Sequence, residues 1–269
     1  MNIAEAVFYG IFQGITEFLP ISSSGHLAVL GFFLSSGENN IPFFVVLHVG
    51  TFFSIMAYFR RDIVQIIVDT ERWVLSGGSD TGSRQGAGML MYILAATFLT
   101  GIIAFPVKDF IENSFSSMRI ISWNFIVTGI LLGLAYLKTG KDLSTPLNLW
   151  RSAVIGIVQG IAALPGISRS GSTVSAGILL NIDREKAAKF SFLIGIPAIA
   201  GATLLEAGEI LNAGSIHIVS YGAGLLTAFL SGMLSIHILF KAVMLGRLHY
   251  FSIYCLSIGI LLFFFMAVR

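Results

Sequence analysis

Six long apolar blocks decide what this chain can fold into. A helix needs roughly 20 mostly apolar residues to cross the hydrocarbon core of a bilayer, and six blocks reach or nearly reach that length. Their approximate bounds are 43–59, 87–105, 121–137, 188–207, 216–240 and 250–268. Charged residues form only 11% of the chain, whereas a soluble domain carries roughly 25%. The sequence therefore predicts an all-α polytopic membrane protein, with residues 1–269 in a single membrane domain.

Two further apolar blocks, 3–34 and 150–181, are too long for one crossing and too short for two. A polar motif interrupts each of them in its middle. A helical arm of about 16 residues reaches only about 24 Å, which is less than the roughly 30 Å of the hydrocarbon core. Irregular backbone at membrane depth is tolerated where protein or water satisfies its polar groups. We therefore expect each block to form a re-entrant helical hairpin.

Basic residues are distributed unevenly over the connections between these blocks. Twelve of the 16 Lys and Arg lie in the stretches 60–86, 138–151, 183–189 and 241–249. The stretches 35–42, 106–120 and 206–215 hold two, Lys108 and Arg119. By the positive-inside rule, the first group of stretches is cytoplasmic and the second is outside.

These loop charges give the two halves of the chain opposite topology. The first hairpin enters from outside and the second from inside. We expect an inverted-topology repeat, in which about 1–140 and about 145–269 each form one hairpin and three transmembrane helices. Within the first half, residues 62–75 are predicted to form a short interfacial helix, followed by a flexible cytoplasmic loop at 76–86.

Both hairpins carry a similar polar motif at a similar place. A Ser-x-Ser-Gly run, at 22–25 and at 168–171, follows Gln13 and Gln159 at the same offset. Each motif also contains a proline that breaks a helix. Paired, interrupted segments in the two halves of an apolar chain indicate a site at the interface of the two repeats.

The chemistry of these breaks favours an anion. Pro20 and the Pro165–Gly166 pair end the first arm of each hairpin, and a serine-rich turn begins the second arm. Free N–H groups and the dipole at such helix starts bind anions. Arg169 adds a planar fork of donors suited to phosphate oxygens. A phosphate or diphosphate is the best match, and Ser22 and Ser24 offer hydroxyls that could bind it.

Glu17 and His26 bring ionisable groups into the same apolar surroundings, where they are expensive and mark function. Glu17 is a hard oxygen ligand for Mg²⁺ or Ca²⁺, and Gln13 lies one helical turn earlier on the same face. Ser22, Ser23 and Ser24 offer hydroxyls, and a serine beside a carboxylate and a histidine has the composition of an activated nucleophile. His26 can alternatively protonate the leaving oxygen.

These segments resemble the undecaprenyl-diphosphate phosphatase family of the bacitracin-resistance type. The resemblance rests on Gln13-x-x-x-Glu17, on the Pro-Ile-Ser-Ser-Ser-Gly-His run at 20–26 and on Pro-Gly-Ile-Ser-Arg-Ser-Gly at 165–171. It implies removal of the terminal phosphate from undecaprenyl diphosphate, which recycles the lipid carrier of bacterial cell-wall synthesis. It also implies dependence on a divalent cation and a site that opens to the outer side of the plasma membrane.

The resemblance assigns roles to single residues. Glu17 matches the essential second carboxylate of the family, and Gln13 stands where some members have Glu, which removes one metal ligand. Ser23 matches the proposed nucleophile and His26 the essential histidine, while Ser24 stands where some members have Thr. The phosphate-binding motif of the family is matched by Arg169, Ser168 and Ser170.

The sequence leaves several alternatives open. In one alternative Ser23 attacks the terminal phosphorus and forms a covalent intermediate. In the other, metal-bound water attacks and Ser23 only binds the substrate. A flippase of polyprenyl phosphate lipids would share the anion cradle, although it would not need a serine, a histidine and a carboxylate together. The spacings Gly156–Gly160 and Gly129–Gly133 permit helix contacts within one chain or in a homodimer. The net charge of +2 gives no reason to expect a nucleic-acid partner.

Overall fold

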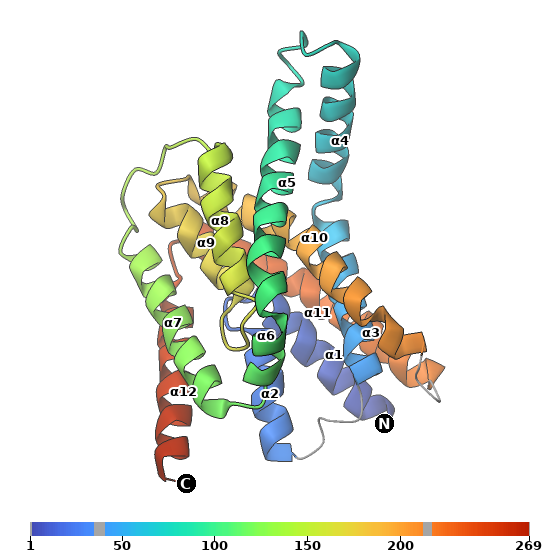
Figure 1. Ribbon diagram of the computed structural model, residues 1–269, viewed down its shortest axis with the longest axis vertical. Helices are drawn as coiled ribbons and strands as arrows, with labels where there is room; N and C mark the ends of the chain where they lie inside the picture. The colour runs from blue at the N-terminus through green and yellow to red at the C-terminus, as the bar shows by residue number, and fades with distance from the viewer. Residues whose placement is uncertain (1, 35–40, 212–216, 269) are drawn as a thin grey trace.

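The structure is a computed structural model that describes residues 2–34, 41–211 and 217–268 (Figure 1). Apart from one isolated bridge between Thr145 and Ile182, the regular structure of these residues is helical. The helices are α1 (Ile3–Phe18), α2 (Ser23–Leu34), α3 (Ile41–Tyr58), α4 (Arg60–Leu75), α5 (Arg84–Ala104), η1 (Phe105–Val107), α6 (Lys108–Ser114), α7 (Met118–Tyr136), α8 (Leu149–Ile161), α9 (Arg169–Leu179), α10 (Arg184–Leu211), α11 (Ile218–Met244) and α12 (His249–Val268).

The predicted spans correspond to long apolar helices. In the described residues, α5, α7, α10, α11 and α12 are each long and apolar enough to cross a membrane, and α3 joins them when counted with α4 as one bent span. Large apolar side chains such as Phe98, Leu204 and Leu261 are at least 69% exposed on their outer faces. Because such faces are stable against lipid, the chain is a multi-pass membrane protein, as the sequence predicts.

The two expected hairpins are present as helix–break–helix units. The first runs from α1 to α2 with its break at 19–22, and the second from α8 to α9 with its break at 162–168. In Figure 1 both breaks lie near the middle of the molecule, with α8 and α9 on the upper side and α1 and α2 on the lower side. This arrangement is the one expected if the hairpins enter from opposite sides.

Helices at corresponding places in the two halves pair in corresponding ways. The helix α1 packs along α11, and α8 packs along α5, which holds the corresponding place in the other half. Likewise α7 packs on α12 and α3 on α10. These pairings are consistent with two interlocked halves, and the inverted repeat itself stays a prediction.

Small residues allow these close helix contacts. A Cβ at Gly14 of α1 would lie 2.6 Å from the Ala228 carbonyl oxygen of α11. Gly156 and Gly160 pack in the same way against α5, and Gly129 and Gly133 against α12. Both GxxxG-like spacings are therefore used within one chain.

The connection between α3 and α5 differs in detail from the prediction. The expected helix at 62–75 is present as α4, which bends by 67° from α3 and packs against α5. Lys189 of α10 pairs with Asp62 at the start of α4, with 2.9 Å between Nζ and Oδ1. The loop ends earlier than predicted, because α5 already begins at Arg84. Whether α4 lies at the membrane interface stays a prediction.

The largest buried cluster lies directly behind the two breaks. Phe18 and Ile21 of the first hairpin and Val174 of the second belong to it, together with Phe190 and Ile194 of α10. Close packing of buried side chains restricts the movement of the hairpin tips. The fold thus places two polar turns on a rigid apolar base.

Candidate active site

Both hairpin tips converge on the carboxylate of Glu17. Its Oε1 accepts a hydrogen bond from Arg169 Nη2 at 2.6 Å, and its Oε2 accepts one from Ser23 Oγ at 2.7 Å. Gln13 Nε2 donates to the same Oε2 at 3.1 Å. The side chains of Glu17 and Arg169 are only 8% and 19% exposed. The structure therefore brings together the acid of the first hairpin and the guanidinium of the second, as the sequence predicts.

Ser23 and Arg169 occupy matching places in their hairpins. Each stands ten residues after its motif glutamine, Gln13 or Gln159, and each is the first residue of the second helical arm. Their side chains reach opposite oxygens of one carboxylate. The two similar motifs thus place a hydroxyl on one side of the carboxylate and a cation on the other.

Two of the candidate serines are committed to the backbone. Ser22 Oγ accepts hydrogen bonds from the N–H groups of Gly25 at 3.3 Å and of Gly166 at 3.1 Å. Ser168 Oγ accepts one from Gly171 N at 3.1 Å and caps α9. Through these bonds Ser22 caps the N-terminus of α2 and Ser168 that of α9, and serine is a preferred N-cap residue. Their role in phosphate binding stays a prediction.

The other two serines stand beside these caps. Ser24 Oγ lies 3.3 Å from Ser22 Oγ, and Ser170 Oγ lies 3.3 Å from Ser168 Oγ. Ser170 Oγ also donates to the Leu19 carbonyl of the first hairpin at 3.4 Å. The tips are therefore linked by side chains on both sides, and phosphate binding by Ser24 and Ser170 stays a prediction.

Glycine is required where the two tips touch. A Cβ at Gly25 would lie 2.7 Å from Gly166 Cα, which is too short for any real contact between these backbones. Gly166 has φ of +92°, a conformation that L side chains rarely adopt. Both positions therefore hold glycine for reasons of geometry.

The helix α7 supports the second tip through two polar side chains. Asn124 Nδ2 donates to the Pro165 carbonyl at 2.7 Å. Thr128 Oγ1 donates to the Gly166 carbonyl at 3.1 Å and accepts from Ser168 N at 3.0 Å. Irregular backbone within a membrane needs hydrogen-bond partners. The side chains of α7 supply them and so stabilise the break between α8 and α9.

His26 lies beside the site but bonds elsewhere. Its Nδ1 is 2.8 Å from the Ser22 carbonyl oxygen, and its Nε2 is 2.7 Å from the Tyr254 hydroxyl. Both ring nitrogens are thus engaged, and the described contacts include no hydrogen bond from His26 to Ser23 or Glu17. Of the two partners proposed for Ser23, the geometry favours Glu17, and a catalytic role for His26 stays a prediction.

Two neighbours of the site were not assigned to it from the sequence. His48 Nε2 lies 4.0 Å from Glu17 Oε2, and Tyr254 bonds to His26. His48 lies within a predicted span, and the sequence leaves it equally open to a polar packing contact or a supporting role at the site. Tyr254 carries no signal in the sequence, because a tyrosine in a membrane helix is common and its contact depends on the packing of α12.

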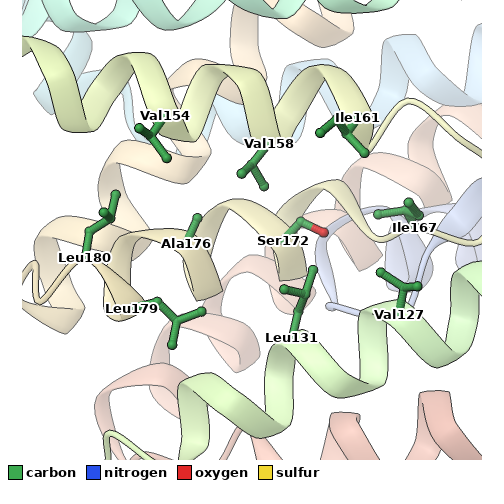
Figure 2. Close-up of a pocket in the computed structure, with 10 residues that line it drawn as sticks. All are labelled: Val127, Leu131, Val154, Val158, Ile161, Ile167, Ser172, Ala176, Leu179 and Leu180. Carbon is green, nitrogen blue, oxygen red and sulfur yellow. The ribbon is translucent and has the colours of Figure 1, made fainter.

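A separate apolar cavity of about 370 Å³ lies between α7, α8 and α9 (Figure 2). Its lining does not include Glu17, Ser23 or Arg169. Val158 and Ser172 line it, and they stand at the offsets that Phe12 and His26 have in the first hairpin. There the two rings meet with centroids 6.1 Å apart. The smaller side chains of the second hairpin leave this space open.

The fold and the site define a multi-pass helical membrane protein in which two interrupted hairpins assemble a carboxylate, a serine and an arginine. The comparison with known families names the class more closely. The chain belongs to the bacitracin resistance protein BacA family, whose model matches residues 6–261.

Curated relatives match along almost their whole length. The undecaprenyl-diphosphatase of Alkaliphilus metalliredigens is 39% identical, over 98% of this chain and 99% of the relative. Those of Korarchaeum cryptofilum and Treponema denticola are each 37% identical, over 97% of this chain and 98% and 96% of the relatives. The family expected from the two motifs is therefore confirmed.

Proposed function

We propose that this protein hydrolyses undecaprenyl diphosphate to undecaprenyl phosphate and inorganic phosphate. The full-length similarity to relatives named undecaprenyl-diphosphatase supports this activity. The main structural support is that the Glu17 carboxylate accepts hydrogen bonds from both Ser23, the proposed nucleophile, and Arg169, the proposed phosphate-binding cation. A phosphoryl-transfer site needs both groups at the same phosphorus.

Ser23 is the nucleophile in this proposal. As Ser23 Oγ attacks the terminal phosphorus, Glu17 Oε2 takes its proton over the existing 2.7 Å hydrogen bond. The new Oγ–P bond forms while the bond from phosphorus to the bridging oxygen breaks, and Glu17 passes the proton to the leaving lipid phosphate. Water then attacks the phosphoserine, with Glu17 taking a proton from the water and returning it to Ser23 Oγ.

Arg169 binds and neutralises the phosphate. Among the described residues, its guanidinium bonds only to Glu17, so the remaining N–H donors of the fork are available for phosphate oxygens. Gly195 of α10 leaves the room that the guanidinium occupies, since a Cβ there would overlap Arg169 Nη1. Charge stabilisation of this kind is the main contribution to catalysis of phosphoryl transfer.

A divalent cation is the expected cofactor, and the residues present provide part of its shell. The described residues contain no group of three His, Cys, Asp or Glu side chains placed to hold a metal. Glu17 offers a carboxylate, and Gln13 Oε1 is buried without a hydrogen-bond partner. These are hard oxygen donors that suit Mg²⁺ or Ca²⁺, with substrate oxygens as further ligands. When bound, the cation would supply additional neutralisation of phosphate charge.

The proposed location is the bacterial plasma membrane, with the site open to the outer side. The distribution of Lys and Arg over the loops supports this orientation. The isoprenoid tail would lie in the bilayer against the apolar faces of the spans. A homodimer would have to use surfaces other than the two GxxxG-like spacings, because these pack within one chain.

Phosphate release by the purified protein tests the proposal. In detergent, the wild type is expected to release phosphate from a soluble short-chain prenyl diphosphate, whereas a pure transporter of polyprenyl phosphates would release none. A phosphoenzyme that forms with labelled substrate and is lost in Ser23→Ala supports attack by the serine. Retention of turnover in Ser23→Ala would instead support direct attack by water.

A further inference from the structure

Tyr254 begins a hydrogen-bonded chain that runs from α12 into the first hairpin tip. Its hydroxyl lies 2.7 Å from His26 Nε2, and the two rings stack with centroids 5.7 Å apart and planes 5° apart. His26 Nδ1 continues the chain to the Ser22 carbonyl oxygen at 2.8 Å. Because a carbonyl oxygen only accepts, Nδ1 carries the proton. In the neutral ring the Tyr254 hydroxyl then donates to Nε2.

Ser22, at the end of this chain, is the strained residue of the tip. Its φ of +69° lies in the left-handed region, which is unfavourable for a residue with a Cβ. Strain of this kind persists only where the surroundings fix it. Here His26 holds the Ser22 carbonyl, and Gly166 N of the other hairpin donates to Ser22 Oγ at 3.1 Å.

The imidazole is also fixed by its ring contacts. Phe125 of α7 meets it edge-on with centroids 5.0 Å apart, and Phe12 of α1 lies at 6.1 Å. Tyr254 contributes the stacked ring. Three helices thus hold one imidazole in one orientation, immediately behind the turn that carries the nucleophile.

We infer that Tyr254 is a positioning residue for the Ser23 hydroxyl. Its hydroxyl holds His26 in the Nδ1–H tautomer, and His26 holds the strained Ser22 turn. Ser23 is the next residue, so the conformation of this turn sets the direction of its Oγ toward Glu17. The inference rests on the proposed phosphatase activity, and it assigns Tyr254 a part in the reaction without contact to the substrate.

Tyr254→Phe is the decisive variant, because it removes the hydroxyl and keeps the stacked ring. We expect kcat to fall about threefold to tenfold, the effect of one lost hydrogen bond. KM should stay close to the wild-type value, since Arg169, the charged group that binds the phosphate, is untouched. The matched control is Tyr250→Phe, one turn earlier on the same helix and 61% exposed, which should retain the wild-type kcat.

A spectroscopic measurement tests the contact without turnover. In protein labelled with ¹⁵N-histidine in lipid, the His26 signals are identified by their loss in His26→Gln. We expect the wild type to show His26 as a single Nδ1–H tautomer, and Tyr254→Phe to shift the Nε2 resonance of His26 alone.

The outcomes separate this inference from the proposed function. If the wild type releases no phosphate, the proposed function fails and the inference falls with it. If the wild type is active, an unchanged kcat in Tyr254→Phe overturns the inference alone. A loss confined to KM or to the thermal midpoint, or an unchanged His26 resonance, also overturns it, because each indicates packing without positioning.

Discussion

Arg169 Nη2 lies 2.6 Å from Glu17 Oε1, although 152 residues separate the two in the chain. The pair lies where the two helical breaks meet. A buried charge pair is strongly destabilised when one partner is removed, because the other charge stays uncompensated. The ion pair therefore holds the two hairpin tips together and also contains the proposed base and the proposed phosphate-binding cation.

The carboxylate of Glu17 is predicted to be indispensable. Glu17→Gln keeps the shape of the side chain but cannot take a proton from Ser23, so kcat should fall about 10²- to 10⁴-fold, the usual contribution of a general base. Phosphate release by the purified variant measures this loss. Glu206→Gln, on the exposed part of α10, is the control and should behave as wild type. A Glu17→Gln variant with wild-type kcat would contradict the assignment.

Arg169 is predicted to act through its planar fork as well as its charge. Arg169→Ala should abolish phosphate release while the protein remains inserted in the membrane. Arg169→Lys keeps the charge but loses paired donation to phosphate oxygens, so KM should rise at least about tenfold. Steady-state kinetics of both variants, with Arg72→Ala on α4 as the control, measure these effects. Near-normal turnover of Arg169→Ala would show that the phosphate clamp is elsewhere.

The contact between the tips is predicted to depend on Gly25. Gly25→Ala places a Cβ 2.7 Å from Gly166 Cα, so the backbones must separate and Ser23 must shift away from the second hairpin. We expect phosphate release to fall more than about tenfold, since misplacement of about 1 Å can cost about 100-fold. Gly222→Ala is the control, because its added methyl meets nothing within 4 Å. Equal activity in the two variants would be incompatible with touching tips.

Thr128 is predicted to stabilise the second tip. Thr128→Val leaves the Gly166 carbonyl and the Ser168 N–H without their side-chain partner. The free energy of unfolding should fall by about 1–3 kcal/mol, the cost of unsatisfied buried polar groups. The measurement is the midpoint of thermal unfolding in detergent, and the control is Thr97→Val. The wild-type Thr97 hydroxyl bonds only to Ile93 O of its own helix, at 2.8 Å. The prediction is wrong if the two variants unfold at the same temperature.

Activity is predicted to require a divalent cation held partly by Gln13. A chelator should stop phosphate release, and Mg²⁺ or Ca²⁺ should restore it. Gln13→Leu removes the unpartnered Oε1, so the cation concentration for half-maximal activity should rise about tenfold or more. Gln159→Leu makes the same change in the second hairpin and should leave the cation requirement unaltered. Full activity in chelator would contradict the metal proposal.

Much of this architecture could be predicted because a bilayer imposes simple rules. Helix length against membrane thickness identified six spans and two hairpins that could not span, and the structure has helices at all these places. The same rules said nothing of the short helix α6 within 106–120, whose sequence lacks a long apolar run. They also placed the start of α5 slightly late, because polar residues at a helix end resemble a loop.

The candidate site was predictable in its ionisable residues and less so in its supports. Glu17 and Arg169 are conspicuous because charges are rare in apolar segments. Asn124 and Thr128 hold the second tip through backbone carbonyls, which depends on how α7 packs. The orientation of His26 toward Tyr254 likewise follows from tertiary packing. Spacing along the sequence therefore identifies the groups of the site more readily than the hydrogen bonds between them.

A disulfide between the tips tests the central claim most directly. The ideal Cβ at Gly171 lies 3.0 Å from Pro20 Cβ, so the two positions are adjacent, and a separation of about 0.5–1 Å between the tips would bring them to the roughly 3.5–4.5 Å of a disulfide. Pro20→Cys with Gly171→Cys, in a Cys255→Ala background and with a protease site in the 76–83 loop, should oxidise readily. On a denaturing gel after cleavage, the two fragments should stay joined until a reductant is added, whereas those of Pro20→Cys with Gly201→Cys should run apart without it. Fragments of the first variant that separate without reductant would contradict the account that the two hairpins form one site.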